Sequence, residues 1–137
     1  MSAPRVLFVC VENSCRSQMA EALGRRAGLE VASAGSRPSG RVHPGVAAAL
    51  AEWGLDVGAQ HSKGLAALDH REYDALVTMG CGDTCADVTA ALREDWPLPD
   101  PRGGDADVFR RVRDELERRI ADLARRLAAG RAGAAGA

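Results

Sequence analysis

The pattern of hydrophobic residues predicts short strands that alternate with helices. Residues 6–9 form an apolar run with the length of a buried strand, and residues 75–79 form another with few polar positions. Residues 29–34 alternate in polarity, and we expect a short fourth strand around residues 94–98. This order indicates a single-domain α/β fold, a three-layer sandwich with a four-stranded parallel sheet and helices on both faces.

Between the strands, apolar residues recur at intervals of three and four, as they do on one face of a helix. The predicted helical segments cover residues 18–23, 43–54, 65–68 (a single turn), 86–93 and 107–128. Residues 1–129 would form the domain, and the Gly/Ala-rich residues 130–137 would form a flexible tail.

The loop between the first strand and the first helix carries the candidate chemistry. Cys10 ends the strand, Arg16 begins the helix and Ser17 follows. Such a loop directs backbone N–H groups and the positive end of the helix dipole at one point, which suits a tetrahedral oxyanion. The same groups favour the thiolate form of a cysteine, and the Ser17 hydroxyl can donate to it. The residues expected to bind the oxyanion are Val11, Glu12, Asn13, Ser14, Cys15 and Arg16.

Composition narrows the class of protein. At 137 residues with a net charge of −1, the chain suits one soluble domain without a basic field for nucleic acid or membrane. Acid-before-base pairs four residues apart in the last helix are typical of a solvated face, so its arginines do not indicate RNA binding. We expect a cytoplasmic monomer, in which four cysteines indicate redox chemistry or metal binding sooner than static disulfides.

A second pair of cysteines, Cys81 and Cys85, directly follows the strand predicted at residues 75–79. That point is the carboxyl edge of a parallel sheet, where Cys10 also emerges and where ligands bind in such folds. Residues four apart on a helix lie roughly 5–6 Å apart, which is compatible with a disulfide. A four-cysteine zinc site is the alternative, although its spacings differ from the usual C-x2-C knuckles.

The stretch C-V-E-N-S-C-R-S-Q-M-A-E, residues 10–21, resembles the active-site loop of thiol-linked arsenate reductases built on the low-molecular-weight protein tyrosine phosphatase fold. The similarity resumes at residues 33–35, at residues 77–79 and at Asp100-Pro101. The resemblance implies conversion of arsenate to arsenite, as in arsenic detoxification.

It also implies a thiol–disulfide cascade. Cys10 attacks arsenate, Cys81 then attacks Cys10 at sulfur, and Cys85 takes over the disulfide. Electrons come from thioredoxin or from a low-molecular-weight thiol such as mycothiol or glutathione, because neither a bound redox cofactor nor a metal is implied. The thioredoxin-linked members carry a longer interval before the last cysteine, so the role of Cys85 in this cascade stays open.

Asp100 resembles the general acid of the parent phosphatases, which protonates the leaving group. Arsenate reduction also needs a proton donor, so Asp100 suits either chemistry. The following residues, Arg102 to Gly104, provide no aromatic ring for a phenol, which favours a small inorganic oxyanion. A low-molecular-weight phosphatase that hydrolyses phosphomonoesters is the main alternative, and a catalytically idle oxyanion-binding or redox-sensing protein is a third.

The last expectation concerns support of the loop. Some arsenate reductases of this kind bind potassium near the loop with an Asn, a Glu and a Ser that match Asn13, Glu21 and Ser33, and with an Asp. Lys63, the one lysine of the sequence, holds the position of that Asp. We expect its ammonium group to face Asn13 and Glu21 and to replace the charge of the metal; a solvated surface lysine is the alternative.

Overall fold

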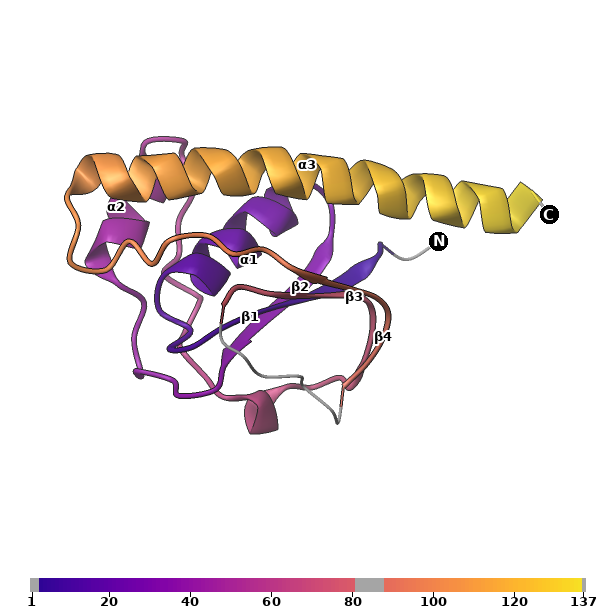
Figure 1. Cartoon of the computed structure of the whole chain (residues 1–137), viewed down its shortest axis with the longest axis horizontal. Helices are drawn as coiled ribbons and strands as arrows, with labels where there is room; N and C mark the ends of the chain where they lie inside the picture. The colour runs from indigo at the N-terminus through magenta and orange to yellow at the C-terminus, as the bar shows by residue number, and fades with distance from the viewer. Residues whose placement is uncertain (1–2, 81–87, 137) are drawn as a thin grey trace.

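The computed structural model describes residues 3–80 and 88–136, and its central feature is one parallel sheet (Figure 1). The strand order is β2-β1-β3-β4, and all three pairings are parallel. The α/β class and the four-stranded parallel sheet expected from the sequence are therefore confirmed. The strands are β1 (Arg5–Cys10), β2 (Glu30–Gly35), β3 (Glu72–Thr78) and β4 (Thr89–Asp95).

Helices cover the two faces of this sheet unequally. The helices are α1 (Arg16–Arg26), α2 (Pro44–Ala51), the single 3-10 turn η1 (Leu65–Ala67) and α3 (Ala106–Gly136). Figure 1 shows α1, α2 and α3 on one side of the sheet and η1 on the other. Within residues 3–80 and 88–136, no helix combines the length and the apolar character that a membrane crossing requires.

The central strand β1 explains this layering. Its side chains alternate between the faces, so Val6 and Phe8 join the larger core beneath the three α-helices, whereas Leu7 and Val9 join a smaller core on the face of η1. All four side chains are fully buried. Burial on both faces is the reason that this strand is apolar at every position instead of at every second one.

The fourth strand is the main correction to the sequence analysis. The helix predicted for residues 86–93 is wrong from residue 89 onward, because residues 89–95 form β4, and the strand predicted at 94–98 therefore begins earlier. Residues 86 and 87 lie outside the described part of the chain. Ala, Leu and Arg favour helices intrinsically, but parallel pairing with β3 along the sheet edge overrides that weak preference.

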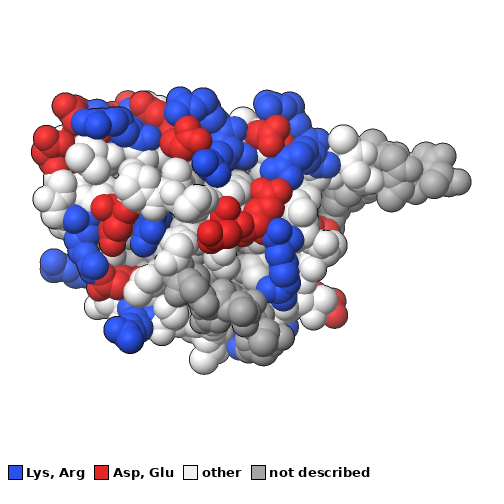
Figure 2. Space-filling view, in the orientation of Figure 1, with Lys and Arg blue, Asp and Glu red and all other residues white. Residues whose placement is uncertain are grey.

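The last helix also differs from the prediction, because α3 continues to Gly136 instead of ending near residue 128. Residues 130–136 are thus helical, and the flexibility expected for residues 130–137 stays a prediction. Along the face shown in Figure 2, basic and acidic side chains alternate over α3. Among them, Glu115–Arg119 and Asp122–Arg126 form ion pairs four residues apart.

Candidate active site

The loop from Cys10 to Ser17 is built between the end of β1 and the start of α1. Outside donors hold its carbonyl groups: the backbone N–H groups of Arg37 and His43 donate to Val11 O and Ser14 O over 2.7 and 2.9 Å. Asn13 adopts a left-handed conformation, with φ of 50°. A loop of this shape, with its carbonyls directed outward, presents N–H groups toward its centre and binds anions there.

The end of β2 packs tightly against this loop at Gly35. A Cβ atom at that position would lie 2.6 Å from Val11 O and 2.8 Å from Asn13 N. Both neighbours are backbone atoms that cannot turn aside, so only glycine fits here. The sheet therefore supports the loop directly.

The loop surrounds a small hollow of about 10 Å³ at the carboxyl edge of the sheet. Among the described residues, Asp100, which follows β4, is the one lining residue from outside the loop. The structure thus brings together the predicted nucleophile, the predicted arginine and the predicted acid, although their roles stay predictions. The lining residues are Cys10, Val11, Glu12, Ser14, Cys15, Arg16 and Asp100.

The Arg16 guanidinium is held along one edge and left open along the other. Its Nη1 donates to Met79 O over 2.8 Å and to Leu98 O over 3.0 Å, and Nη2 lies 3.9 Å from Asp100 Oδ2. The buried Nε has no hydrogen-bond partner among the described residues. A buried donor without a partner is costly, and the Nε–Nη2 edge is shaped to bind two oxygens of an oxyanion. This edge therefore fits a ligand in the hollow.

The hydrogen bonds around Cys10 take their direction from one fixed donor, the backbone N–H of Lys63. It donates to Asn13 Oδ1 over 2.9 Å, so the amide nitrogen of Asn13 is the donor to Ser17 Oγ over 2.8 Å. Because Ser17 Oγ accepts that bond, its own hydrogen is available to donate to Cys10 Sγ, 2.9 Å away. A hydroxyl donor in this position stabilises a thiolate.

Two glutamines that the sequence analysis missed hold Asn13 in this orientation. Gln18 Nε2 donates to Asn13 Oδ1 over 2.9 Å and to His61 O over 2.9 Å, and Gln60 Nε2 donates to Gln18 Oε1 over 2.8 Å. Gln18 is fully buried on α1. The sequence did contain a signal for Gln18, because it is a polar residue on the core-facing side of the first turn of the helix.

Lys63 lies beneath the loop, where its half-buried ammonium is near the buried Glu21 carboxylate. Its Nζ lies 3.6 Å from Glu21 Oε1, which also accepts from Ser33 Oγ over 2.6 Å, and Nζ donates to His61 O over 3.2 Å. The Lys63 side chain is only 16 % exposed. Its ammonium therefore faces Glu21, whereas Asn13 contacts the backbone N–H of the same residue.

Cys15 shares the hollow with Cys10 but differs from it chemically. Burial is the main cause that raises the pKa of the Cys15 thiol to about 11, and its Sγ accepts a hydrogen bond from Ser14 Oγ at 3.7 Å. At neutral pH this thiol stays protonated, and thiols attack as thiolates. Cys15 thus acts as a neutral wall of the hollow.

The remaining predicted site residues, Cys81 and Cys85, lie outside the described residues, so their parts in a disulfide cascade stay predictions. The described chain approaches the site at Met79, which bonds Arg16, and at Gly80, which has φ of 77°.

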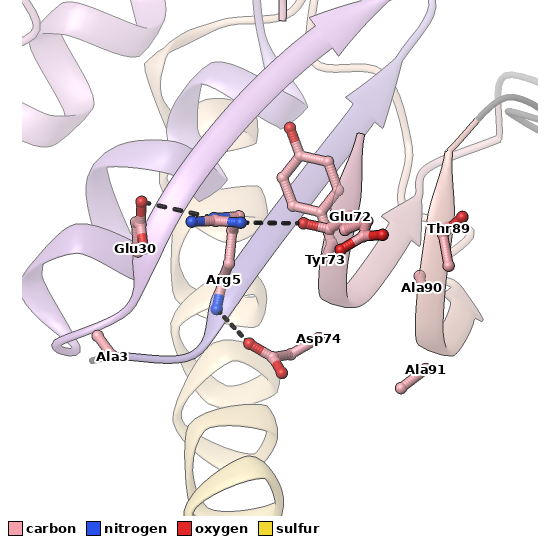
Figure 3. A pocket seen from close by; sticks show the side chains of 9 residues that line it. All are labelled: Ala3, Arg5, Glu30, Glu72, Tyr73, Asp74, Thr89, Ala90 and Ala91. Atoms are coloured by element: carbon pink, nitrogen blue, oxygen red, sulfur yellow. Dashed lines mark hydrogen bonds and ion pairs between the residues drawn. The ribbon is translucent and has the colours of Figure 1, made fainter. Parts of the chain in front are cut away.

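A larger hollow, of about 500 Å³, lies at the opposite edge of the sheet, beside the start of β1 (Figure 3). Arg5 crosses it: its backbone N–H donates to Asp74 Oδ2, its Nη1 donates to Glu72 O, and its Nε lies 3.5 Å from Glu30 Oε1. The described side chains that line it include neither a cysteine nor a histidine. The candidate nucleophile, Cys10, lines the smaller hollow at the carboxyl edge.

Comparison with known proteins agrees with this geometry. A family model described as low molecular weight phosphotyrosine protein phosphatase matches residues 5–132, and the chain belongs to this family. Among curated relatives, the glutaredoxin arsenate reductase of Synechocystis sp. is 39 % identical over 125 residues, which cover 87 % of this chain and 95 % of the relative. An arsenate reductase of Halalkalibacterium halodurans is 38 % identical, with 90 % and 97 % covered.

Solved structures give the same result. An arsenate reductase in the phosphate binding state superposes with a TM-score of 0.83 at 38 % identity, covering 93 % of this chain and 99 % of the other. The YwlE arginine phosphatase of Geobacillus stearothermophilus superposes with a TM-score of 0.79 at 30 % identity, covering 95 % and 96 %. The fold thus serves both reductases and phosphatases.

The hydroxyl donor to Cys10 can be tested with Ser17→Ala. We expect the alkylation of Cys10 by iodoacetamide at pH 7 to slow about tenfold or more, because a hydrogen bond to a charged group is worth roughly 1.5–3 kcal/mol. Asn13→Gly, which tolerates the positive φ, should slow it in the same direction. Ser14→Ala is the control, since that hydroxyl bonds Cys15, and an unchanged rate in Ser17→Ala would contradict the assignment.

The buried ammonium can be tested with Lys63→Ala. We expect a loss of roughly 1–3 kcal/mol in the free energy of unfolding, because within the described part of the chain Glu21 keeps only Arg25 as a charged partner. Arg25→Ala, which removes the more exposed partner, is the control and should cost about 0–1 kcal/mol. Melting temperature and activity are compared in potassium and sodium salts, and a wild type that clearly gains from potassium would refute a built-in cation.

Proposed function

We propose that this protein is an arsenate reductase that converts arsenate to arsenite in arsenic detoxification. One observation carries the proposal: the Cys10 sulfur lies 2.9 Å from the Ser17 hydroxyl and beside a buried guanidinium whose Nε has no hydrogen-bond partner among the described residues. The relatives named arsenate reductase, which match most of the chain, support the choice of oxyanion. In the described structure no aromatic side chain lines the hollow, which suits a small inorganic substrate.

The first step is attack of the Cys10 thiolate on arsenic. Arg16 and the loop N–H groups hold the arsenate oxygens and stabilise the charge that develops on them. Asp100 lines the same hollow and supplies the proton with which one oxygen leaves as water. An S–As bond forms in place of an As–O bond, and arsenic remains As(V).

The second step reduces the arsenic. The Cys81 thiolate attacks Cys10 Sγ, the S–As bond breaks, and its electron pair stays on arsenic, which leaves as arsenite. The two thiols supply the two electrons and become a Cys10–Cys81 disulfide. Cys85 then attacks Cys81, releases the Cys10 thiolate, and forms a Cys81–Cys85 disulfide.

An external reductant closes the cycle. Thioredoxin suits a disulfide between two neighbouring cysteines, whereas mycothiol or glutathione would resolve the Cys10–Cys81 bond without Cys85. The relative named glutaredoxin arsenate reductase supports the second route. We place the monomeric protein in the cytoplasm, because the cascade requires cysteines that return to the reduced state.

A phosphomonoester hydrolase is the second candidate, because it shares the first step of the cycle. Asp100 beside Arg16 suits protonation of an alcohol leaving group, and an arginine phosphatase is among the structural neighbours. Incubation with arsenate and each thiol donor, beside an assay on an aryl phosphate, distinguishes the two activities.

Cys10→Ser tests the nucleophile. A serine hydroxyl is scarcely ionised near pH 7, so we expect arsenite formation to disappear. Binding of inorganic phosphate, measured by calorimetry, should persist because the loop and Arg16 are unchanged. Retention of a tenth of the wild-type turnover would exclude Cys10 as the nucleophile.

Cys85→Ser tests the relay of the disulfide. With thioredoxin as the donor, we expect one turnover and then a trapped Cys10–Cys81 disulfide, found by peptide mapping under non-reducing conditions. Cys15→Ser is the matched control and should continue to turn over, since Cys15 is protonated at neutral pH. Undiminished multiple turnover in Cys85→Ser would show that Cys10–Cys81 is reduced directly.

A further inference from the structure

An ion pair lies beside the oxyanion hollow, at its lining residue Glu12. The Glu12 carboxylate belongs to the loop itself and pairs with the guanidinium of Arg102, from the segment that follows β4. The same guanidinium lies 3.6 Å from Asp100 Oδ2, and Asp100 in turn lies 3.9 Å from Arg16 Nη2. Arg102 therefore lies between two carboxylates that both line the hollow.

The backbone on the Arg102 side of this ion pair is fixed. Arg102 N donates to Asp100 Oδ1 over 3.0 Å, and Gly104 N donates to Pro101 O over 2.9 Å, which closes a turn. Gly103, within that turn, has φ of 87°. The Arg102 side chain remains 50 % exposed, so it can swing away while its backbone stays in place.

The Glu12 side is anchored separately. Glu12 O accepts hydrogen bonds from Ser39 N over 3.0 Å and from Ser62 Oγ over 2.9 Å. The ion pair thus joins two independently supported walls of the site. Closing or opening it requires only side-chain rotation.

The hollow is so small that the ion pair beside it affects which anions can bind. Its volume of about 10 Å³ is close to the space that a single water molecule needs. An oxyanion is larger than this, so side chains that line the hollow, such as Glu12, must shift before it enters, and ion pairs as exposed as Glu12–Arg102 open readily. A small oxyanion lets the pair form again above it, whereas the organic group of a phosphomonoester would hold the pair open.

The charge of Arg102 also favours the binding of a small anion. While Arg102 is in place, its positive charge offsets that of Glu12, and Asp100 lies near both Arg102 and Arg16, so the repulsion that these carboxylates exert on an entering anion is reduced. Without Arg102, both carboxylates would repel the anion at short range.

We propose that the Glu12–Arg102 ion pair determines the specificity of this site for small inorganic oxyanions over organic phosphate esters. The inference rests on the proposed function, which supplies the oxyanion. Arg102 is a specificity residue here and takes no part in the bond changes at arsenic.

The test compares two anions that differ only by an organic group, inorganic phosphate and the non-hydrolysable phenylphosphonate. Their dissociation constants are measured by calorimetry on the full chain for the wild type, Arg102→Ala, Glu12→Gln and the double variant. Arg118→Ala is the control, because that arginine pairs with Glu115 on the exposed face of α3. Melting curves establish that each variant is folded.

We expect the preference for phosphate over phenylphosphonate to fall about tenfold in both single variants, since each removes the Glu12–Arg102 ion pair beside the hollow. The phosphate affinities should change in opposite directions: weaker in Arg102→Ala, which leaves two carboxylates, and tighter in Glu12→Gln, which removes one. The double variant should bind phosphate with nearly wild-type affinity.

An unchanged preference in both single variants would overturn the inference, and so would a preference that changes equally in Arg118→Ala. Arsenite formation is measured on the same wild-type preparation with each thiol donor. Its absence would overturn the proposed function, independently of the anion preference.

Discussion

The backbone N–H of Lys63 is the donor on which the site depends. Side-chain amides and hydroxyls can reverse their hydrogen bonds, but a backbone N–H can only donate. Because this N–H meets Asn13 Oδ1, the amide nitrogen of Asn13 must be the donor to Ser17, which leaves the Ser17 hydroxyl hydrogen available for Cys10. A fixed peptide group thus determines the electrostatic environment of a sulfur atom three hydrogen bonds away.

This arrangement explains why so many polar groups lie buried around a small loop. Unsatisfied polar groups in a core are costly, but a fully bonded network has a single arrangement and therefore holds its members rigidly. Gln18 and Gln60 complete the network, and the buried charges of Glu21 and Lys63 support it from below. Two buried side-chain donors in the described structure have no hydrogen-bond partner: Arg5 Nε still lies 3.5 Å from Glu30 Oε1, whereas Arg16 Nε is at the place where the ligand would bind.

Local patterns in the sequence were sufficient to predict most strands and helices of the fold and the loop from Cys10 to Ser17. The apolar run at β1 and the Cys10–Arg16 spacing depend on neighbouring residues, so they can be read directly. The strand β4 could not be predicted in this way, because its helix-favouring residues form a strand only through pairing with β3. Gln60 and Arg102 reach the site from distant segments, and only the folded chain brings them to Gln18 and Glu12.

The pairing of Cys10 with Gly35 has a consequence for how this scaffold tolerates change. Successive residues of a strand face opposite sides, so a slip of one residue between β1 and β2 would turn the sulfur away from α1 and bring a side chain against the loop backbone. The register between β1 and β2 thus determines whether the Cys10 sulfur reaches the site. Inserting or deleting a single residue within β1 should still allow the sheet to fold but should abolish the reaction at Cys10. Changes of length at the amino edge of the sheet, where the strands begin, should leave the site around Cys10 unchanged.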